Sequence, residues 1–281
     1  MTREALTHEY ELANILYPGP DWKAARVEEG GQFHLVLVAD GQAVMRMSRT
    51  VEAARDMQRR VDLVQALSGK FSFQLPTALS EVWHGDGSAA VIQRYVPGAA
   101  HLPHAGDAAR LHAVLEEFAA VDVGPLAHLL APPFSFRGPW DEAKTETTLR
   151  ALPAELVADA QRVLSTIAGF SGITPSLVHG DLAGHNMHWI DGHLVGVLDW
   201  DLAAAWDPAL NSAYLGLWHG ADLLEDIAPS PEEAWRAQVW LGAMGLESFF
   251  DTITQDNHAD RDRLLDKIAP RIHAASSAAS G

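Results

Sequence analysis

The spacing of apolar residues changes at Pro97-Gly98, and this change constrains the fold more than any other feature of the chain. Between positions 22 and 96, short apolar runs alternate with turn residues, which is typical of strands joined by hairpins. Beyond position 98 the apolar residues recur at helical spacing. The segments with that spacing are 105–121, 140–149, 154–170 and much of 231–274.

This change predicts an α+β protein with two lobes. We expect a small antiparallel-sheet lobe at residues 1–97, a larger, mainly helical lobe at residues 98–281, and a hinge at about 93–98. Within the first lobe, Asp40-Gly41 separates two apolar runs, 33–39 and 43–47, and is the strongest hairpin signal in the sequence.

Two further elements are expected in the first lobe. Residues 51–67 carry apolar side chains on one helical face, so we expect a helix there. Residues 79–83 and 89–96 form a second hairpin candidate around the turn His84-Gly85-Asp86-Gly87.

Composition narrows the class of protein. The 281 residues are 48% hydrophobic, which is enough for a substantial core, and their formal net charge is −17. That charge repels nucleic acid and anionic membranes but suits a cationic substrate. The chain has no cysteine, so disulfides and thiolate catalysis are excluded. Residues 1–10 lack the apolar stretch of a signal peptide, and no apolar run reaches the ~18 residues of a membrane span, so we expect a cytoplasmic protein.

Two loops carry the side chains with the clearest chemistry. The apolar run at Leu177-Val178 stops at Gly180 and is followed by Asp181, and Asn186 comes five residues later. A second apolar run, 194–198, ends at Asp199. A carboxylate can take the proton of an acceptor hydroxyl, and hard oxygen ligands suit Mg²⁺. Asp181 is therefore the candidate base, and Asn186 and Asp199 are the candidate metal ligands.

These residues resemble the aminoglycoside phosphotransferase family, which includes macrolide, choline and other small-molecule kinases. The resemblance is carried by His179-Gly180-Asp181 with Asn186, by Val197-Leu198-Asp199-Trp200-Asp201, and by Trp206-Asp207-Pro208. A lone His-Gly-Asp is a weak signal, because His84-Gly85-Asp86 repeats the tripeptide with Val91 at the fifth following position. The resemblance implies a protein-kinase-like two-lobe fold and phosphoryl transfer to an alcohol.

The resemblance also implies roles for residues of the second half. Asp181 is the base, Asn186 and Asp199 hold Mg²⁺, and His179 braces the loop. Asp207 anchors the segment after the metal loop. Asp201 is either a supporting acid or an exposed loop carboxylate. Asn211 stands where the family often has a further aspartate.

In the first half, the resemblance implies a nucleotide site. Gly30-Gly31-Gln32 is similar to the loop that covers the nucleotide, and Arg46 stands where the family places a basic residue that reaches the phosphates. That residue usually pairs with a glutamate of the next helix. Here Gln58, Arg59 and Arg60 occupy the place, and Glu52 is the nearest glutamate.

The hinge segment supplies the rest of the nucleotide site. Residues 91–98 resemble the inter-lobe linker, where backbone groups near Arg94 and Val96 would read the purine edge.

These expectations combine into one leading hypothesis. The chain transfers the γ-phosphate of ATP or GTP to a hydroxyl of an aminosugar antibiotic, an aminoglycoside or a macrolide, and so inactivates it. Acids in the late helices are candidates for binding a cationic substrate, and the tryptophans of the second lobe are either core or pocket residues. The acids are Glu225, Asp226, Glu247 and Asp251, and the tryptophans include Trp206 and Trp240.

Three alternatives stay open. The first is a kinase of another small metabolite, choline-like or a sugar. The second is a metal-dependent hydrolase built on His179, Asp181, His185 and Asp199. The third is a catalytically weak nucleotide-binding relative, which the missing glutamate in 51–67 suggests.

Overall fold

The computed structural model describes residues 2–31, 33–255 and 258–280, and it divides the chain into two compact units. Unit 1 comprises Met1–His101 and His185–Asp201, and unit 2 comprises Leu102–Gly184 and Leu202–Gly281. The sequence predicted a division at about residue 97 and did not assign 185–201 to the first lobe. An antiparallel sheet dominates unit 1 and helices dominate unit 2, so the predicted α+β class is confirmed.

Unit 1 is built on a six-stranded sheet in the order β1-β2-β3-β4-β6-β5, in which neighbouring strands are antiparallel. The strands are β1 (Thr2–Glu4), β2 (Arg26–Glu28), β3 (His34–Ala39), β4 (Ala43–Ser48), β5 (Trp83–Gly85) and β6 (Ser88–Arg94). The hairpin predicted around Asp40-Gly41 is confirmed as β3 and β4, with Gly41 at φ +71°.

The prediction for the second hairpin is wrong in its first strand, which was expected at 79–83. The strand is β5 (Trp83–Gly85), and the turn consists of Asp86 and Gly87, at φ 51° and 76°. Two consecutive positive φ angles produce a tight two-residue turn, so the paired strands extend further toward the turn than the four-residue turn 84–87 would allow. Asp86 of the repeated His-Gly-Asp tripeptide is therefore a turn residue.

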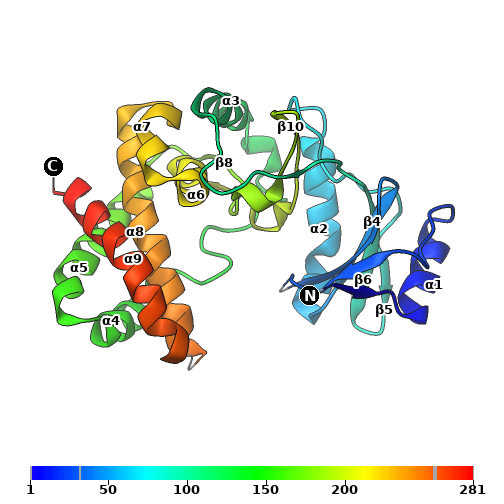
Figure 1. Cartoon of the computed structure of the whole chain (residues 1–281), viewed down its shortest axis with the longest axis horizontal. Helices are drawn as coiled ribbons and strands as arrows, with labels where there is room; N and C mark the ends of the chain where they lie inside the picture. Colours follow the sequence, from blue (N-terminus) through cyan, green and yellow to red (C-terminus); the bar gives the residue numbers. More distant parts are fainter. Residues whose placement is uncertain (1, 32, 256–257, 281) are drawn as a thin grey trace. The chain divides into compact units, whose positions relative to one another are not determined.

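Helix α2 (Val51–Leu67) has the bounds predicted from its apolar spacing. Thr50 caps it by accepting a hydrogen bond from the amide of Ala53 at 3.1 Å. The buried face of α2 includes Met57 and packs on β4 and β6 (Figure 1). Helix α1 (Thr7–Leu16), which was not predicted, precedes β2.

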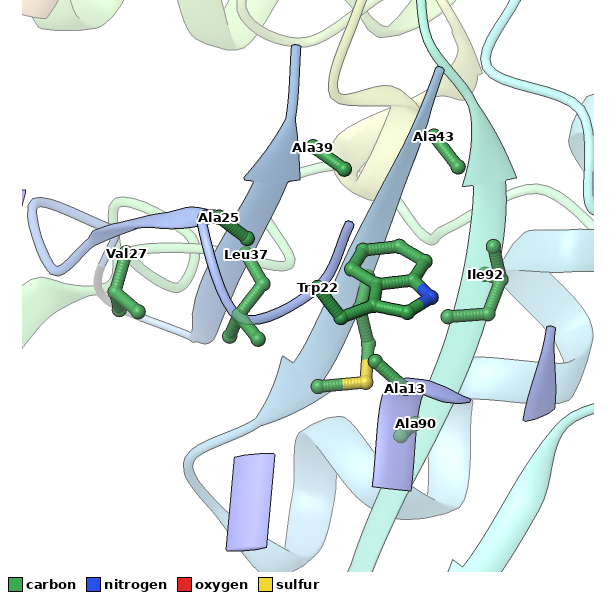
Figure 2. Close-up of a cluster of buried hydrophobic side chains, with 10 residues drawn as sticks. Ala13, Trp22, Ala25, Val27, Leu37, Ala39, Ala43, Ala90 and Ile92 are labelled. Atoms are coloured by element: carbon green, nitrogen blue, oxygen red, sulfur yellow. The ribbon is translucent and has the colours of Figure 1, made fainter. Parts of the chain in front are cut away.

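The two faces of the large sheet contribute to separate apolar clusters. Figure 2 shows the first, in which Trp22, 2% exposed, lies among side chains of the sheet and Ala13 of α1. Alternate residues of β6 point to opposite faces, so Ile92 joins this cluster while Val91 joins Met57 of α2 in the second. Burial on both faces makes the sheet a rigid support for side chains at the strand ends.

Unit 1 contains a second sheet, in the order β10-β9-β7, of β7 (Ala99–Ala100), β9 (Met187–Ile190) and β10 (His193–Val197). Strand β10 is tied to the segment after α2, because Gln74 donates from its amide to Val195 and accepts from Val197. Residues 185–201 are thereby part of the hydrogen-bonded framework of unit 1.

Unit 2 is mainly helical. Its helices are α3 (Ala108–Ala119), α4 (Glu142–Ala151), α5 (Ala154–Ala168), α6 (Ala209–His219), α7 (Leu224–Ile227), α8 (Pro231–Thr254) and α9 (His258–Ala278). Helices α8 and α9 run side by side (Figure 1). Strands β8 (Ser176–Val178) and β11 (Ala204–Trp206) form a small antiparallel pair. In the part of the chain that the structure describes, no helix is long and apolar enough to cross a membrane.

Candidate active site

The loop after β8 presents Asp181 through a glycine that its backbone requires. Gly180 has φ +84°, and a Cβ on it would lie 2.5 Å from the carbonyl oxygen of Leu202. A side chain at this position would clash with backbone as well as adopt an unfavourable φ. His179, on the other side of the glycine, is fully buried. The apolar strand, the buried histidine and the glycine together fix the position of the backbone at Asp181.

Hydrogen bonds hold this loop in its conformation. The amide of Asp181 donates to Nδ1 of His179 at 3.2 Å, and the amide of His179 donates to Oδ1 of Asn211 at 3.0 Å. Nδ2 of Asn211 donates to the carbonyl of Leu177 at 3.0 Å. A side-chain amide both accepts and donates, which an ionised carboxylate cannot do. Asn211 therefore holds the end of β8 by a pair of bonds that an aspartate in its place could not make.

A cavity in unit 2 opens beside this loop. Its lining comes from residues between 132 and 137 and from helices α6 and α8. Gly180 is part of its wall. Several further lining residues are aromatic, namely Phe134, Phe136, Trp206, Tyr214 and Trp240. Trp206 and Trp240 are thus pocket residues as well as packing residues.

Tyr214 connects the cavity electrostatically to Asp181. Its pKa is raised, first by burial and then by the negative charges of Asp181 and Glu247. A tyrosine with a raised pKa stays protonated and can donate a hydrogen bond. Its importance was not predicted from the sequence, because an isolated tyrosine in a helix carries no motif.

Of the four late acids proposed as binders of a cationic substrate, one lines the cavity. Glu247 is in its wall, and Asp251, one turn further along α8, contacts Arg137. Glu225 and Asp226 are exposed on α7 and do not belong to the lining.

In unit 1, Arg46 on β4 lies beside the two acids of the second loop. Its guanidinium donates to both carboxylate oxygens of Asp201, at 3.1 and 2.9 Å, and to Oδ1 of Asp199 at 3.1 Å. Burial alone would lower the pKa of Arg46, but the two carboxylates raise it, so it stays charged. Asp201 is 5% exposed, so its interpretation as an exposed loop carboxylate is wrong.

The helix that follows β4 was expected to supply a glutamate as the partner of Arg46, but it supplies an arginine to this cluster. Arg60 of α2 lies with Nη1 3.0 Å from Oδ2 of Asp201, while Glu52 is exposed in the first turn of α2. Asp201 therefore takes the place of the helix acid and pairs with two arginines at once. Burial acts to raise the pKa of Asp201, but the charges of Arg46 and Arg60 outweigh it and keep the pKa below its usual value.

His34 completes this charged cluster as a neutral residue. It is 3% exposed, and burial together with the charge of Arg46 lowers its pKa to about 3. A neutral imidazole has one donor and one acceptor nitrogen. Its Nδ1 is 2.9 Å from Nη2 of Arg46 and 3.3 Å from Oδ2 of Asp201, and its Nε2 is 3.1 Å from Nη1 of Arg60. Both ring nitrogens therefore lie beside guanidinium groups, and this disfavours the charged form of the ring.

Asn186 and Asp199 are brought together by the backbone. The amide of Leu198 donates to the carbonyl of Asn186 at 2.8 Å, and Asp199 follows with φ 58°, a conformation uncommon for a residue other than glycine. An amide oxygen and a carboxylate oxygen are ligands that suit Mg²⁺, which keeps further positions for phosphate oxygens and water. The residues present therefore fit this ion.

The alternative of a metal-dependent hydrolase required a cluster of histidine and acidic side chains that could bind a transition metal. Among the residues that the structure describes, no group of three or more histidine and acidic side chains gathers as a metal site.

The predicted nucleotide loop connects β2 to β3. A Cβ on Gly31 would lie 2.7 Å from the carbonyl oxygen of His34, so the backbone approaches closely there, whereas Gly30 has open space. Gln32 lies outside the described residues.

Some backbone groups of the hinge segment already have partners within the chain. The amide of Arg94 donates to Thr77, and the carbonyl of Val96 lies 3.1 Å from Nδ1 of His188.

Asp207 is buried at the end of β11. Its two oxygens accept from Nε of Arg236 at 3.1 and 3.2 Å, and from Nε1 of Trp240 at 2.8 Å. The amide of Ala209 donates to it as well, at 3.1 Å. These contacts join the segment after the second loop to helix α8.

Comparisons with known proteins agree on a family. The model of the phosphotransferase enzyme family matches residues 23–242. Viomycin phosphotransferase of Streptomyces vinaceus is 31% identical over 237 residues, which cover 78% of this chain and 81% of that protein.

Two solved structures show the same fold. The GDP and kanamycin complex of APH(2")-IIIa has a TM-score of 0.75 at 16% identity, over 95% of this chain and 98% of that one. The macrolide 2'-phosphotransferase MphH of Brachybacterium faecium has a TM-score of 0.66 at 20% identity, over 94% and 99%.

Proposed function

Because the chain belongs to the phosphotransferase enzyme family, and is therefore a kinase, we propose that it transfers the γ-phosphate of ATP or GTP to an antibiotic hydroxyl. The acceptor we propose is an aminosugar antibiotic, an aminoglycoside or a macrolide, which the transfer inactivates. The curated relative adds viomycin as a third acceptor to test.

One observation carries this proposal. Arg46 donates to both Asp201 and Asp199, so a cation of the sheet stands beside the carboxylate that we assign to the metal. In phosphoryl transfer the protein performs little covalent chemistry and mainly positions groups and neutralises charge. A guanidinium next to a magnesium ligand meets that requirement. Arg46 would bind phosphate oxygens while Asp201 holds its side chain in place.

The remaining groups have separate roles in the proposed reaction. Asn186 and Asp199 would hold Mg²⁺, which when bound neutralises the charge of the phosphates. The carboxylate of Asp181 would accept the proton of the acceptor hydroxyl as its oxygen forms the new bond to the γ-phosphorus. The bond from that phosphorus to the oxygen bridging to the β-phosphate breaks, and the nucleoside diphosphate leaves with that electron pair.

Supporting residues keep these groups in position. His179 would hold the amide of Asp181, and Asp207 would anchor the segment that follows the metal loop. Gly30 and Gly31 would cover the nucleotide, and backbone groups near Arg94 and Val96 would contact the purine edge.

A phosphate-transfer assay tests the proposal. Purified protein with labelled ATP or GTP is offered aminoglycosides, macrolides, viomycin and choline-like alcohols, and labelled product is measured. We expect transfer to at least one antibiotic. Transfer only to a choline-like alcohol would replace the acceptor, and nucleotide-induced thermal stabilisation without transfer would support the catalytically weak relative.

Substitution of the proposed base separates its role from folding. Asp181→Asn should lower turnover by at least about 100-fold, a typical contribution of a general base, with an unchanged melting temperature. Asp86→Asn is the matched control, because it changes the aspartate of the other His-Gly-Asp tripeptide, in an exposed turn whose φ of 51° asparagine tolerates. Retained activity in Asp181→Asn would remove this residue from its proposed role.

A further inference from the structure

The acidic side of the cavity in unit 2 is already paired with cations of the chain. Arg137 donates from Nε to Oδ2 of Asp251 at 2.8 Å, and its Nη1 is 3.6 Å from Oε2 of Glu247. Nζ of Lys144 is 4.0 Å from Oε1 of Glu247. Two carboxylates of α8 thus face two cations, and the two charged residues that line the cavity, Glu247 and Arg137, balance each other.

The pairing is held in place by the backbone. Lys144 is 7% exposed and donates to the carbonyls of Arg137 and Gly138, both at 3.1 Å. Its ammonium also lies over the ring of Trp140, 4.4 Å from the centroid. A buried ammonium that is satisfied in this way fixes the backbone from which Arg137 extends. Arg137 is therefore positioned against α8 before any ligand binds.

Arg137 is a residue of the cavity wall together with Glu247. Its side chain is 27% exposed, and that of Glu247 is 17% exposed. A ligand's ammonium group could approach Glu247 only by also approaching the guanidinium of Arg137, which has the same positive charge. Like charges brought this close weaken binding, whereas the aromatic part of the wall is unaffected by the ligand's charge.

We propose that Arg137 is a specificity-determining residue that occupies Glu247 and Asp251 and so makes the cavity disfavour polycationic acceptors. The favoured acceptors present an uncharged, apolar face or a single amino group to Phe134, Trp206 and Tyr214. This inference rests on the proposed function, because it takes the cavity as the acceptor site.

The test is a calorimetric titration of the full chain with kanamycin, without nucleotide. Arg137→Met removes the guanidinium that stands beside Glu247 in the cavity wall, so kanamycin should bind about tenfold more tightly, a modest gain for a new ion pair, with a steeper dependence on salt. Arg137→Lys keeps the charge and should stay close to the unsubstituted protein. Arg150→Met is the matched control, because it removes an exposed arginine of α4 that pairs with Glu146.

A second variant tests the same idea without relying on the folding of Arg137→Met. Glu247→Gln alone should change kanamycin affinity by less than about threefold, since the carboxylate is already paired. In the Arg137→Met background the same change should abolish the gain. A large loss of kanamycin affinity in Glu247→Gln alone, or an unchanged affinity in folded Arg137→Met, overturns the proposal.

The binding test is independent of phosphate transfer. A tenfold gain in Arg137→Met together with no transfer to any acceptor would support the role of Arg137 and contradict the proposed function. Transfer to antibiotics with no change of kanamycin affinity in Arg137→Met would support the proposed function and contradict the role of Arg137.

Discussion

Two buried aspartates, Asp201 in unit 1 and Asp207 in unit 2, are alike in burial and differ in charge balance. Asp207 is 3% exposed and faces one arginine, an indole N–H and a backbone amide. Asp201 is 5% exposed and faces Arg46 and Arg60, with neutral His34 between them. Asp207 therefore faces one guanidinium, whereas two guanidiniums share the buried carboxylate of Asp201.

This difference separates an anchoring cluster from one suited to binding. A neutral buried pair satisfies itself and attracts no ligand strongly. Two further acids lie next to these arginines: Asp56 is 3.7 Å from Arg60, and Asp199, whose side chain is 50% exposed, pairs with Arg46. Bound phosphates and a metal ion would add charges of both signs at that point. Burial therefore does not distinguish the two aspartates, but the count of charges around each does.

The largest effect is expected from breaking the anchoring cluster. Asp207→Ala should lower the free energy of unfolding by about 3–5 kcal/mol, because Arg236 and the indole of Trp240 would remain buried without their acceptor. Denaturant unfolding measures it. Glu232→Gln removes the exposed partner of the same Arg236 and should cost less than about 1 kcal/mol. Equal losses in the two variants would contradict the assignment of Asp207 as an anchor.

The binding cluster should respond in activity more than in stability. Arg46→Met should lower turnover by about 100-fold, as for the loss of one electrostatic group that stabilises a transition state. Steady-state kinetics with saturating acceptor measures it. Arg49→Met is the control, since Arg49 is exposed just beyond the same strand and donates to the carbonyl of Glu29. Unchanged turnover in Arg46→Met would indicate that the Asp201 cluster, like the contacts of Asp207, only stabilises the fold.

A substitution of Arg60 tests how much the second arginine contributes to the stability of the cluster around Asp201. Arg60→Met should lower the free energy of unfolding by about 2 kcal/mol, the contribution of a hydrogen bond to a charged group, since Asp201 keeps its two bonds to Arg46. Arg59→Met on the same helix should cost less, because Arg59 pairs with Asp56, half exposed, at one turn's distance. A loss in Arg60→Met as large as that in Asp207→Ala would show that Arg46 alone does not satisfy Asp201.

The smallest effect is expected at an aspartate near the surface, Asp159 of α5. The hydroxyl of Ser276 donates to it and His273 contacts it, which lowers its pKa. A lowered pKa stabilises the fold above the unfolded value of about 4, and this contribution is lost as pH falls through the folded value. Asp159→Asn should therefore flatten the acid side of the stability profile by less than about 1 kcal/mol. Thermal melts across pH 2 to 7 measure it, and an unchanged acid slope would contradict the assignment.

Local sequence patterns correctly predicted the helix and hairpin whose formation depends on residues close together in the chain. The bounds of α2 and the first hairpin follow from apolar spacing and from Asp40-Gly41. Helix α1 was missed, since its residues are mostly polar and only Ala13 and Glu9 are buried. The second hairpin was misplaced because the sequence does not state which two of four turn residues adopt positive φ.

The charged clusters depend on residues far apart in the chain, and the sequence predicted them less well. Arg46 and Asp201 are separated by 155 positions, so no local pattern indicates that they pair. The missing helix glutamate suggested an incomplete site, but an acid from another segment supplies the charge. His34 and Arg137 were missed for the same reason, because each acquires its role from partners on other elements.

The interruption of unit 1 by residues 102–184 limits how the chain can be cut or recombined. A fragment that ends at residue 101 would retain Arg46 and Arg60 but lose Asp201, the buried carboxylate with which both guanidiniums pair. The first unit is therefore not an exchangeable cassette. Recombination between relatives would yield functional hybrids only if the crossover points carry 1–101 and 185–201 from the same parent.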